Sequence, residues 1–148
     1  MKPSNLKMGK VWLPLQGLIL LCLFLSACVG SPGAPAGRQV AENYFKAMEQ
    51  KDEKTALSYF SDNHSPQDWK SHLDNITKSL GTVKSVHFID EELSTVYSGR
   101  FYILDYEVKY DTGKQAGETI TVFDSVKDDD TPLIVAHKIT AKGFHRLF

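Results

Sequence analysis

The sequence has no long hydrophobic run and no excess of charge of either sign. Its most apolar stretch, from Gly17 to Leu25, is too short for a hydrocarbon core, which takes about 20 apolar residues to cross. The chain carries 17 basic and 18 acidic residues, for a formal net charge of −1. This balance makes it a poor candidate for binding nucleic acid or for electrostatic adhesion to anionic lipid. We therefore expect no nucleic-acid partner.

Motifs for nucleophilic, nucleotide-binding and metal-dependent enzymes are also missing. The chain contains no G-x-S-x-G elbow, phosphate loop or dinucleotide fingerprint. His64 and His72 lie eight residues apart across a predicted helix start, which is not the spacing of a zinc site. The acidic run 128–130 lacks the glycine and terminal glutamate of a calcium loop, so it is interpreted as a solvated loop tip. We expect no cofactor and no metal.

The first 27 residues have the pattern of a secretory signal peptide. Lys2, Lys7 and Lys10 form a basic start without any acid, an apolar segment follows, and small residues precede Cys28. Because Cys22 lies in the segment to be removed, the mature chain keeps one cysteine and no structural disulfide is predicted. Removal of three lysines also shifts the formal net charge to −4.

The segment Leu25-Ser26-Ala27-Cys28 resembles the lipobox of bacterial lipoproteins. The resemblance implies that Cys28 is diacylated on sulfur, becomes the first residue of the mature chain and anchors it to a membrane. Palmitate-type chains each contribute about 0.8 kcal/mol per buried methylene, so two or three hold firmly. Val29 stands where an aspartate commonly retains Gram-negative lipoproteins at the inner membrane, which favours the outer membrane facing the periplasm. The alternative is an ordinary secreted protein with a chance cysteine.

The mature chain divides into a tether, residues 28–37, and one domain, residues 38–148. The tether is nearly all Gly, Pro, Ala and Ser, which favours extended conformations and offers nothing to pack. Apolar spacing predicts helices over 39–51, 52–60 and 65–80. The third is the best marked, because Ser65 can cap it, Pro66 fits its first turn and Gly81 can end it.

After Gly81 the apolar pattern changes to a period of two. Strands are predicted over 82–89, 93–97, 100–110, 117–126 and 132–142, with a turn at 111–114. In the third strand, Tyr102 to Tyr110 share one face at alternate positions, and Phe101, Ile103, Asp105, Glu107 and Lys109 share the other. Val83 is expected on the face opposite Val86 and Phe88. The order predicts an α+β fold, with N-terminal helices packed on a curved antiparallel sheet of four or five strands.

The opening segment from Val40 to Asp52 resembles that of the nuclear-transport-factor-two-like superfamily. The residues that carry the resemblance are Tyr44, Phe45, Ala47, Asp52 and the run 57–60. The resemblance implies a cone-like sheet wrapped around helices, with room for a cavity. A cystatin-like relative, which also packs a helix on a curved sheet, is a close alternative.

Enzymes of that superfamily, such as ketosteroid isomerases, place polar side chains on the concave sheet. By that analogy Asp105 is the best candidate base, because it interrupts an apolar face in mid-strand. The competing interpretation is that this face passes from buried to solvated along the strand. His137 shares a predicted face with Leu133, Val135 and Ile139, and a structural role is favoured over a catalytic one. Both remain weak catalytic candidates.

These observations favour a membrane-anchored, non-catalytic envelope lipoprotein that binds a small apolar ligand or a protein partner. One alternative is a pocket enzyme of the ketosteroid-isomerase-like type that uses Asp105 or His137. Another is an accessory subunit of a larger envelope assembly.

Overall fold

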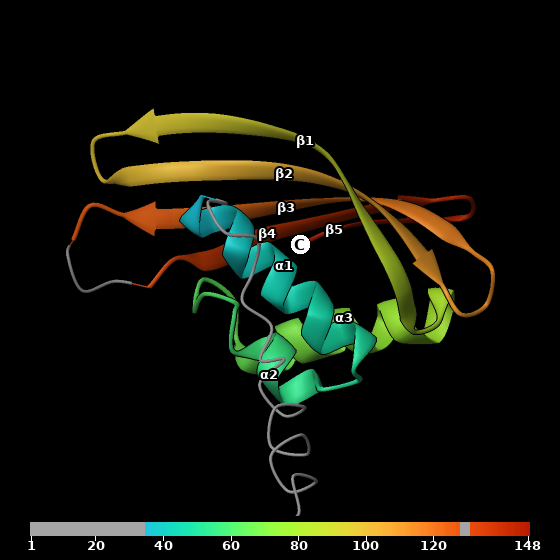
Figure 1. The fold of residues 1–148 in the computed structure, drawn as a ribbon. Helices are drawn as coiled ribbons and strands as arrows, with labels where there is room; N and C mark the ends of the chain where they lie inside the picture. Colours follow the sequence, from blue (N-terminus) through green and yellow to red (C-terminus); the bar gives the residue numbers. More distant parts are fainter. Residues whose placement is uncertain (1–34, 128–130) are drawn as a thin grey trace, which may run out of the picture.

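The computed structural model describes residues 35–127 and 131–148. The predicted signal peptide, the lipobox, Cys28 and most of the tether lie outside the described residues, as does the acidic run 128–130. The described chain folds as three helices followed by five strands, in an α+β arrangement (Figure 1).

Helix α1 spans Ala36–Glu49 and begins earlier than the sequence suggested. Ala36 and Gly37, expected in the tether, belong to this helix, and Gly37 is buried. A Cβ atom on Gly37 would lie 2.3 Å from Cδ2 of Tyr102, so only glycine allows the helix backbone this close to the sheet. The helix ends at Glu49, and Lys51, two residues further on, has a left-handed φ of 59°.

Helices α2 (Glu53–Leu57) and α3 (Pro66–Leu80) begin at the predicted caps. The Asp52 carboxylate accepts a hydrogen bond from the Thr55 amide, and the Ser65 hydroxyl accepts one from the Asp68 amide. Gly81, with a φ of 106°, follows the last turn of α3. The apolar stripe expected on α3 is buried as predicted: Trp69, Leu73, Ile76 and Leu80.

The five strands form one antiparallel sheet in which each strand pairs with the next along the chain. They are β1 (Val83–Val96), β2 (Gly99–Tyr110), β3 (Gln115–Ser125), β4 (Leu133–Ala141) and β5 (Phe144–Leu147). Figure 1 shows that the sheet curves over the helices without closing on itself. The two segments predicted at 82–89 and 93–97 are one continuous strand, and the residues after 142 add a short fifth strand.

Irregular pairing explains where the predicted strand faces were wrong. The β1–β2 register shifts between Val83 and Ser85, so Val83, Val86 and Phe88 all pack on the core instead of dividing between two faces. In β4, the pairing with β3 skips Val135, so Ile134 is buried with His137 while Val135 is only half-buried. Val126, predicted on the face of Ile120 and Val122, lies beyond the end of β3 and is 65% exposed.

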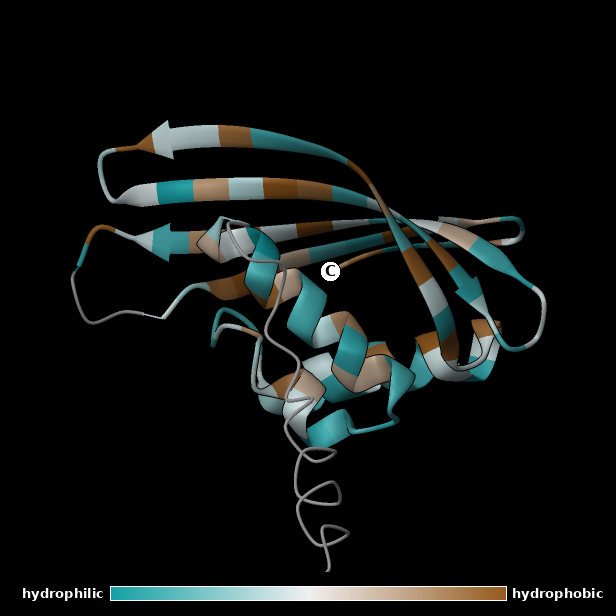
Figure 2. Ribbon diagram, viewed as in Figure 1, coloured by the Kyte–Doolittle hydropathy of each residue, from teal (hydrophilic) through white to brown (hydrophobic). Residues whose placement is uncertain are grey.

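The core lies between the concave face of the sheet and the helices. Alternation along β2 buries Tyr102, Leu104, Tyr106, Val108 and Tyr110, as the sequence predicted. Figure 2 shows apolar and polar residues alternating along the strands above the helices. The chain beyond α2 is tied to the sheet through Phe60, which forms a parallel bridge with Ile134 of β4.

Candidate functional site

A chain of four polar side chains runs through the core beneath the sheet. Tyr110 ends β2, Glu118 lies in β3, His137 lies in β4, and His72 comes from the middle of α3. Each of the four is at most 2% exposed. Because polar groups are rarely buried without a purpose in structure or function, this cluster is the principal candidate site in the described residues.

The contacts connect the four residues end to end. The Tyr110 hydroxyl donates a hydrogen bond to Glu118 Oε1. Glu118 Oε2 lies 2.8 Å from Nε2 of His137, and Nδ1 of His137 lies 3.1 Å from Nε2 of His72. A carboxylate only accepts hydrogen bonds, so His137 donates through Nε2. The other ring nitrogen of His137, Nδ1, faces Nε2 of His72, and the tautomer decides which of the two donates.

One ring nitrogen at the end of this series of contacts has no partner. His72 Nδ1 is buried and has no hydrogen-bond partner. The network is therefore satisfied from Tyr110 to His72 Nε2 and open at its last atom.

Burial sets the electrostatics of the cluster. Burial, helped by the neighbouring His137, lowers the pKa of His72 from its ordinary value of 6.5 to about 3. Burial, and next the Glu118 carboxylate, raise the pKa of Tyr110 well above its usual range. The same two causes raise the pKa of Tyr44. His72 and both tyrosines are thus neutral at neutral pH.

Aromatic rings enclose the two histidines. The His137 ring lies 5.6 Å from the Tyr44 ring and 6.4 Å from the Phe60 ring, measured between centroids. The His72 ring stacks on Phe148 at 4.8 Å. With exposed fractions of 0%, neither histidine presents an atom to a molecule in solvent. The cluster can hold protons and fix the packing of α3 on the sheet, but a substrate cannot touch it in this conformation.

Asp105, the other candidate from the sequence, lies on the opposite side of the sheet. It is exposed on the convex face, where the Thr119 hydroxyl donates to its carboxylate at 2.6 Å. Its neighbours on that face change from half-buried Phe101 and Ile103 to exposed Glu107 and Lys109. This face therefore passes from half-buried to solvated along β2, and no part of it belongs to the core. The dry pocket that a base of the ketosteroid-isomerase type needs does not surround Asp105.

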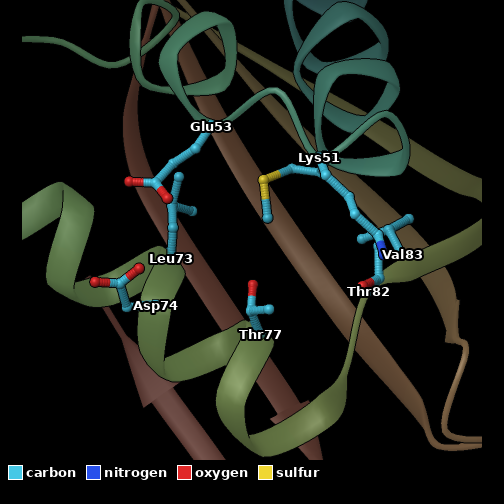
Figure 3. Close-up of a pocket in the computed structure, with 8 residues that line it drawn as sticks. Lys51, Glu53, Leu73, Asp74, Thr77, Thr82 and Val83 are labelled. Carbon is cyan, nitrogen blue, oxygen red and sulfur yellow. The ribbon is translucent and has the colours of Figure 1, made fainter.

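A small pocket of about 140 Å³ opens between the helices and the start of β1 (Figure 3). Its apolar lining comes from Met48, Leu73 and Val83. The polar lining comes from Lys51, Glu53, Asp74, Thr77 and Thr82. Pockets for drug-sized ligands are about 300–1,000 Å³, so this one could take only a small fragment or a ligand's end.

The acidic residues of this pocket are already paired. Lys70 Nζ lies 2.6 Å from Glu53 and 3.2 Å from Asp74, at the solvent-exposed surface. Lys51, in contrast, makes no ion pair among the described residues. The pocket therefore combines an apolar floor with one cationic side chain, Lys51, that has no ion-pair partner among the described residues.

Sequence reasoning found His137 but not its partners. Glu118 lies two residues before Ile120, so strand parity already places it on the buried face. His72 lies three residues after Trp69 and four before Ile76, on the stripe that the sequence assigned to the core. Both residues therefore carry a local sequence signal for burial.

Two further searches of the described residues gave negative results. No group of three or more His, Cys, Asp or Glu side chains is arranged to hold a metal ion in the part of the chain that the structure describes. Among the same residues, no helix combines the length and the hydropathy that a transmembrane span requires.

Comparison with known proteins identifies no family. No protein-family model matches the chain, and no curated protein matches it. The solved structure of Bdellovibrio bacteriovorus Bd1075 is similar over 70% of this chain and 38% of that chain, with 16% sequence identity and a TM-score of 0.49. This chain thus spans well under half of the length of that structure, and the likeness concerns the backbone alone.

Proposed function

We propose that the protein is a lipid-anchored, non-catalytic lipoprotein of the bacterial envelope. Diacylated Cys28 would hold it in a membrane, and Val29 favours the outer membrane facing the periplasm in a Gram-negative host. The single α+β domain then serves as a binding module for a small apolar ligand or a protein partner. A nuclear-transport-factor-two-like or cystatin-like relationship is part of this proposal, and the packing of helices on a curved sheet supports it.

The enclosure of the polar cluster carries the non-catalytic part of the proposal. His137 and His72 are fully buried, whereas Asp105 is solvated on the convex face. Catalysis needs a titratable group that reaches the reacting atoms within hydrogen-bond distance. The buried histidines cannot reach such atoms in this conformation, and the solvated Asp105 lacks the dry pocket of a ketosteroid-isomerase-type base, so the buried polar residues are better explained as fold-specifying.

The pocket in Figure 3 supports the binding part of the proposal. Its apolar floor of Met48, Leu73 and Val83 would take a short hydrocarbon segment, and Lys51 would attract an acidic end. A short-chain fatty acid is therefore a suitable probe. Its binding would shift backbone NMR resonances of α3 and the start of β1, and Leu73→Trp, which fills the floor, should abolish the shifts.

Lipid anchoring is tested by growing the producing bacterium with labelled palmitate. We expect label in the mature chain, none in a Cys28→Ser variant, and unchanged label in a Cys22→Ser variant, because Cys22 lies in the removed segment. Salt washing should leave the acylated protein in the membrane fraction. A mature chain without label would overturn the proposal.

The enzyme alternative predicts a different mutational pattern. If Asp105 is a base, Asp105→Ala should abolish activity without loss of stability. If Asp105 is only a solvated surface residue, the substitution should change neither activity nor stability.

The assembly alternative is favoured by the outer edge of β1, which pairs with no strand among the described residues and which a partner strand could extend. Equilibrium sedimentation with and without co-purified envelope proteins distinguishes it, because a subunit would sediment as a complex.

A further inference from the structure

Four exposed apolar residues lie toward one end of the sheet, on both of its faces. Leu93 and Val96 lie at the end of β1, Tyr97 lies in the turn to β2, and Val126 follows β3. Their exposed fractions are 54%, 42%, 102% and 65%. The Val126 amide donates to the Ser98 carbonyl at 3.1 Å, so the two turns are held together. We call Leu93, Val96, Tyr97 and Val126 the apolar tip.

The described chain begins at this same end. Gly37, in the first turn of α1, packs on Tyr102, which lies three residues after the start of β2. Figure 1 shows the first turn of α1 near the end of the sheet where β1 meets β2 and where β3 ends. The turns after β2 and β4 lie at the other end of the sheet. The segment that leads to Cys28 therefore joins the domain near the apolar tip.

We propose that the apolar tip lies in the headgroup region of the membrane that holds the lipid anchor. This inference rests on the proposed lipidation of Cys28. We infer that the apolar tip contacts a lipid surface. The short chain between Cys28 and the domain keeps the tip close to the bilayer.

The tether limits how far the start of α1 can stand from the membrane. Seven residues, 29–35, separate Cys28 from α1 and span at most about 25 Å when fully extended. From Tyr102, β2 covers about 26 Å to its end at Tyr110, where the far turn begins. With the far turn on the bilayer, the start of α1 would stand at the very limit of a fully extended tether, whereas with the apolar tip on the bilayer it lies well within reach.

The chemistry of the tip fits the interface better than it fits water or the hydrocarbon core. Tyrosine is enriched at headgroup level, where the ring is apolar and the hydroxyl stays hydrated. Asp128 to Asp130 follow Lys127 in the sequence, so attraction to anionic lipid is not the driving force. The contact we infer is apolar, and salt should not weaken it.

The test uses the full acylated chain and one introduced thiol. With Cys28 acylated and Cys22 removed, a Ser98→Cys variant carries a single thiol beside Tyr97, and Lys142→Cys places the matched thiol at the far end. Each is labelled with a polarity-sensitive fluorophore and reconstituted into vesicles of mostly phosphatidylethanolamine with some phosphatidylglycerol. Nitroxide-labelled lipid then reports proximity to the bilayer.

We expect at least about twofold stronger nitroxide quenching at position 98 than at position 142, with a blue-shifted emission at position 98 only. Adding Tyr97→Ser and Val126→Ser to the Ser98→Cys variant should reduce its quenching to the level of Lys142→Cys. High salt should change neither value.

The unfavourable outcomes separate the two proposals. Equal quenching at both positions in protein that sediments with vesicles would overturn the membrane contact and leave the anchor intact, with the tip free for a protein partner. Quenching that disappears in high salt would also overturn the apolar contact. Protein that stays in the supernatant, with a second label on a free Cys28, would overturn the anchor and this inference together.

Discussion

Lowering the pH should destabilise the protein through His72. Its pKa of about 3 in the folded chain is below the ordinary value of 6.5, because burial and the neighbouring His137 disfavour the charged form. Below pH 6.5 the unfolded chain binds a proton at His72 that the folded chain does not bind. Folding stability from this group is therefore complete above pH 6.5 and is lost progressively as the pH falls toward 3.

The magnitude follows from the two pKa values. The free energy of unfolding falls by up to about 1.4 kcal/mol per pH unit inside this window. Between pH 7.5 and pH 4.5, His72 alone should cost about 2–3 kcal/mol, a large share of the roughly 5–15 kcal/mol by which domains are stable. Since the side chain is 0% exposed, solvent screening reduces this value little.

Urea unfolding of the mature chain, followed by fluorescence of buried Trp69, measures the effect at pH 7.5, 6.0 and 4.5. His72→Gln keeps a donor near the position of Nε2 but does not titrate, so its stability should fall less with pH than that of the parent. His87→Gln, at an exposed position of β1, controls for losing an imidazole and should keep the parental slope. A parent and a His72→Gln variant with equal slopes would refute the reasoning.

Three further predictions concern packing and backbone, each measured as a shift in urea midpoint. Tyr110→Phe leaves the buried Glu118 carboxylate without its hydroxyl donor and should destabilise by about 1–3 kcal/mol; an unchanged midpoint would mean that water replaces the hydroxyl. Lys51→Gly relieves a left-handed φ of 59° and should stabilise by up to about 1 kcal/mol, so a loss would assign the lysine side chain a role in stability. Gly37→Ala places a Cβ atom 2.3 Å from Tyr102 and should destabilise by about 1–3 kcal/mol; full tolerance would show that α1 can move away from the sheet.

Local signals predicted the helices well. Ser65 and Pro66 mark the start of α3, and Gly81 marks its end. The helical period alone predicts the apolar stripe between them. The start of α1 was missed because Gly37 disfavours a helix by itself. It is helical because the small residue lets the helix backbone approach Tyr102, a contact between residues far apart in the sequence.

Strand parity predicted β2 completely and β1 and β4 only in part. One unpaired residue inverts the side-chain alternation, and the sequence around Lys84 or Val135 carries no mark of such an irregularity. The faces of Val83 and Leu133 could therefore be assigned only from the pairing of neighbouring strands.

Local sequence patterns were sufficient to predict the helix starts at Asp52 and Ser65, the α+β order and the shared face of His137 and Ile139. Those features follow from local caps and from periodicities of 3.6 and 2, which a short segment already contains. The contacts of His72 and Glu118 with His137, which lies 65 and 19 residues away along the chain, became visible only in the folded domain. Long-range contacts of this kind depend on strand register and on how α3 crosses the sheet, which no local pattern encodes.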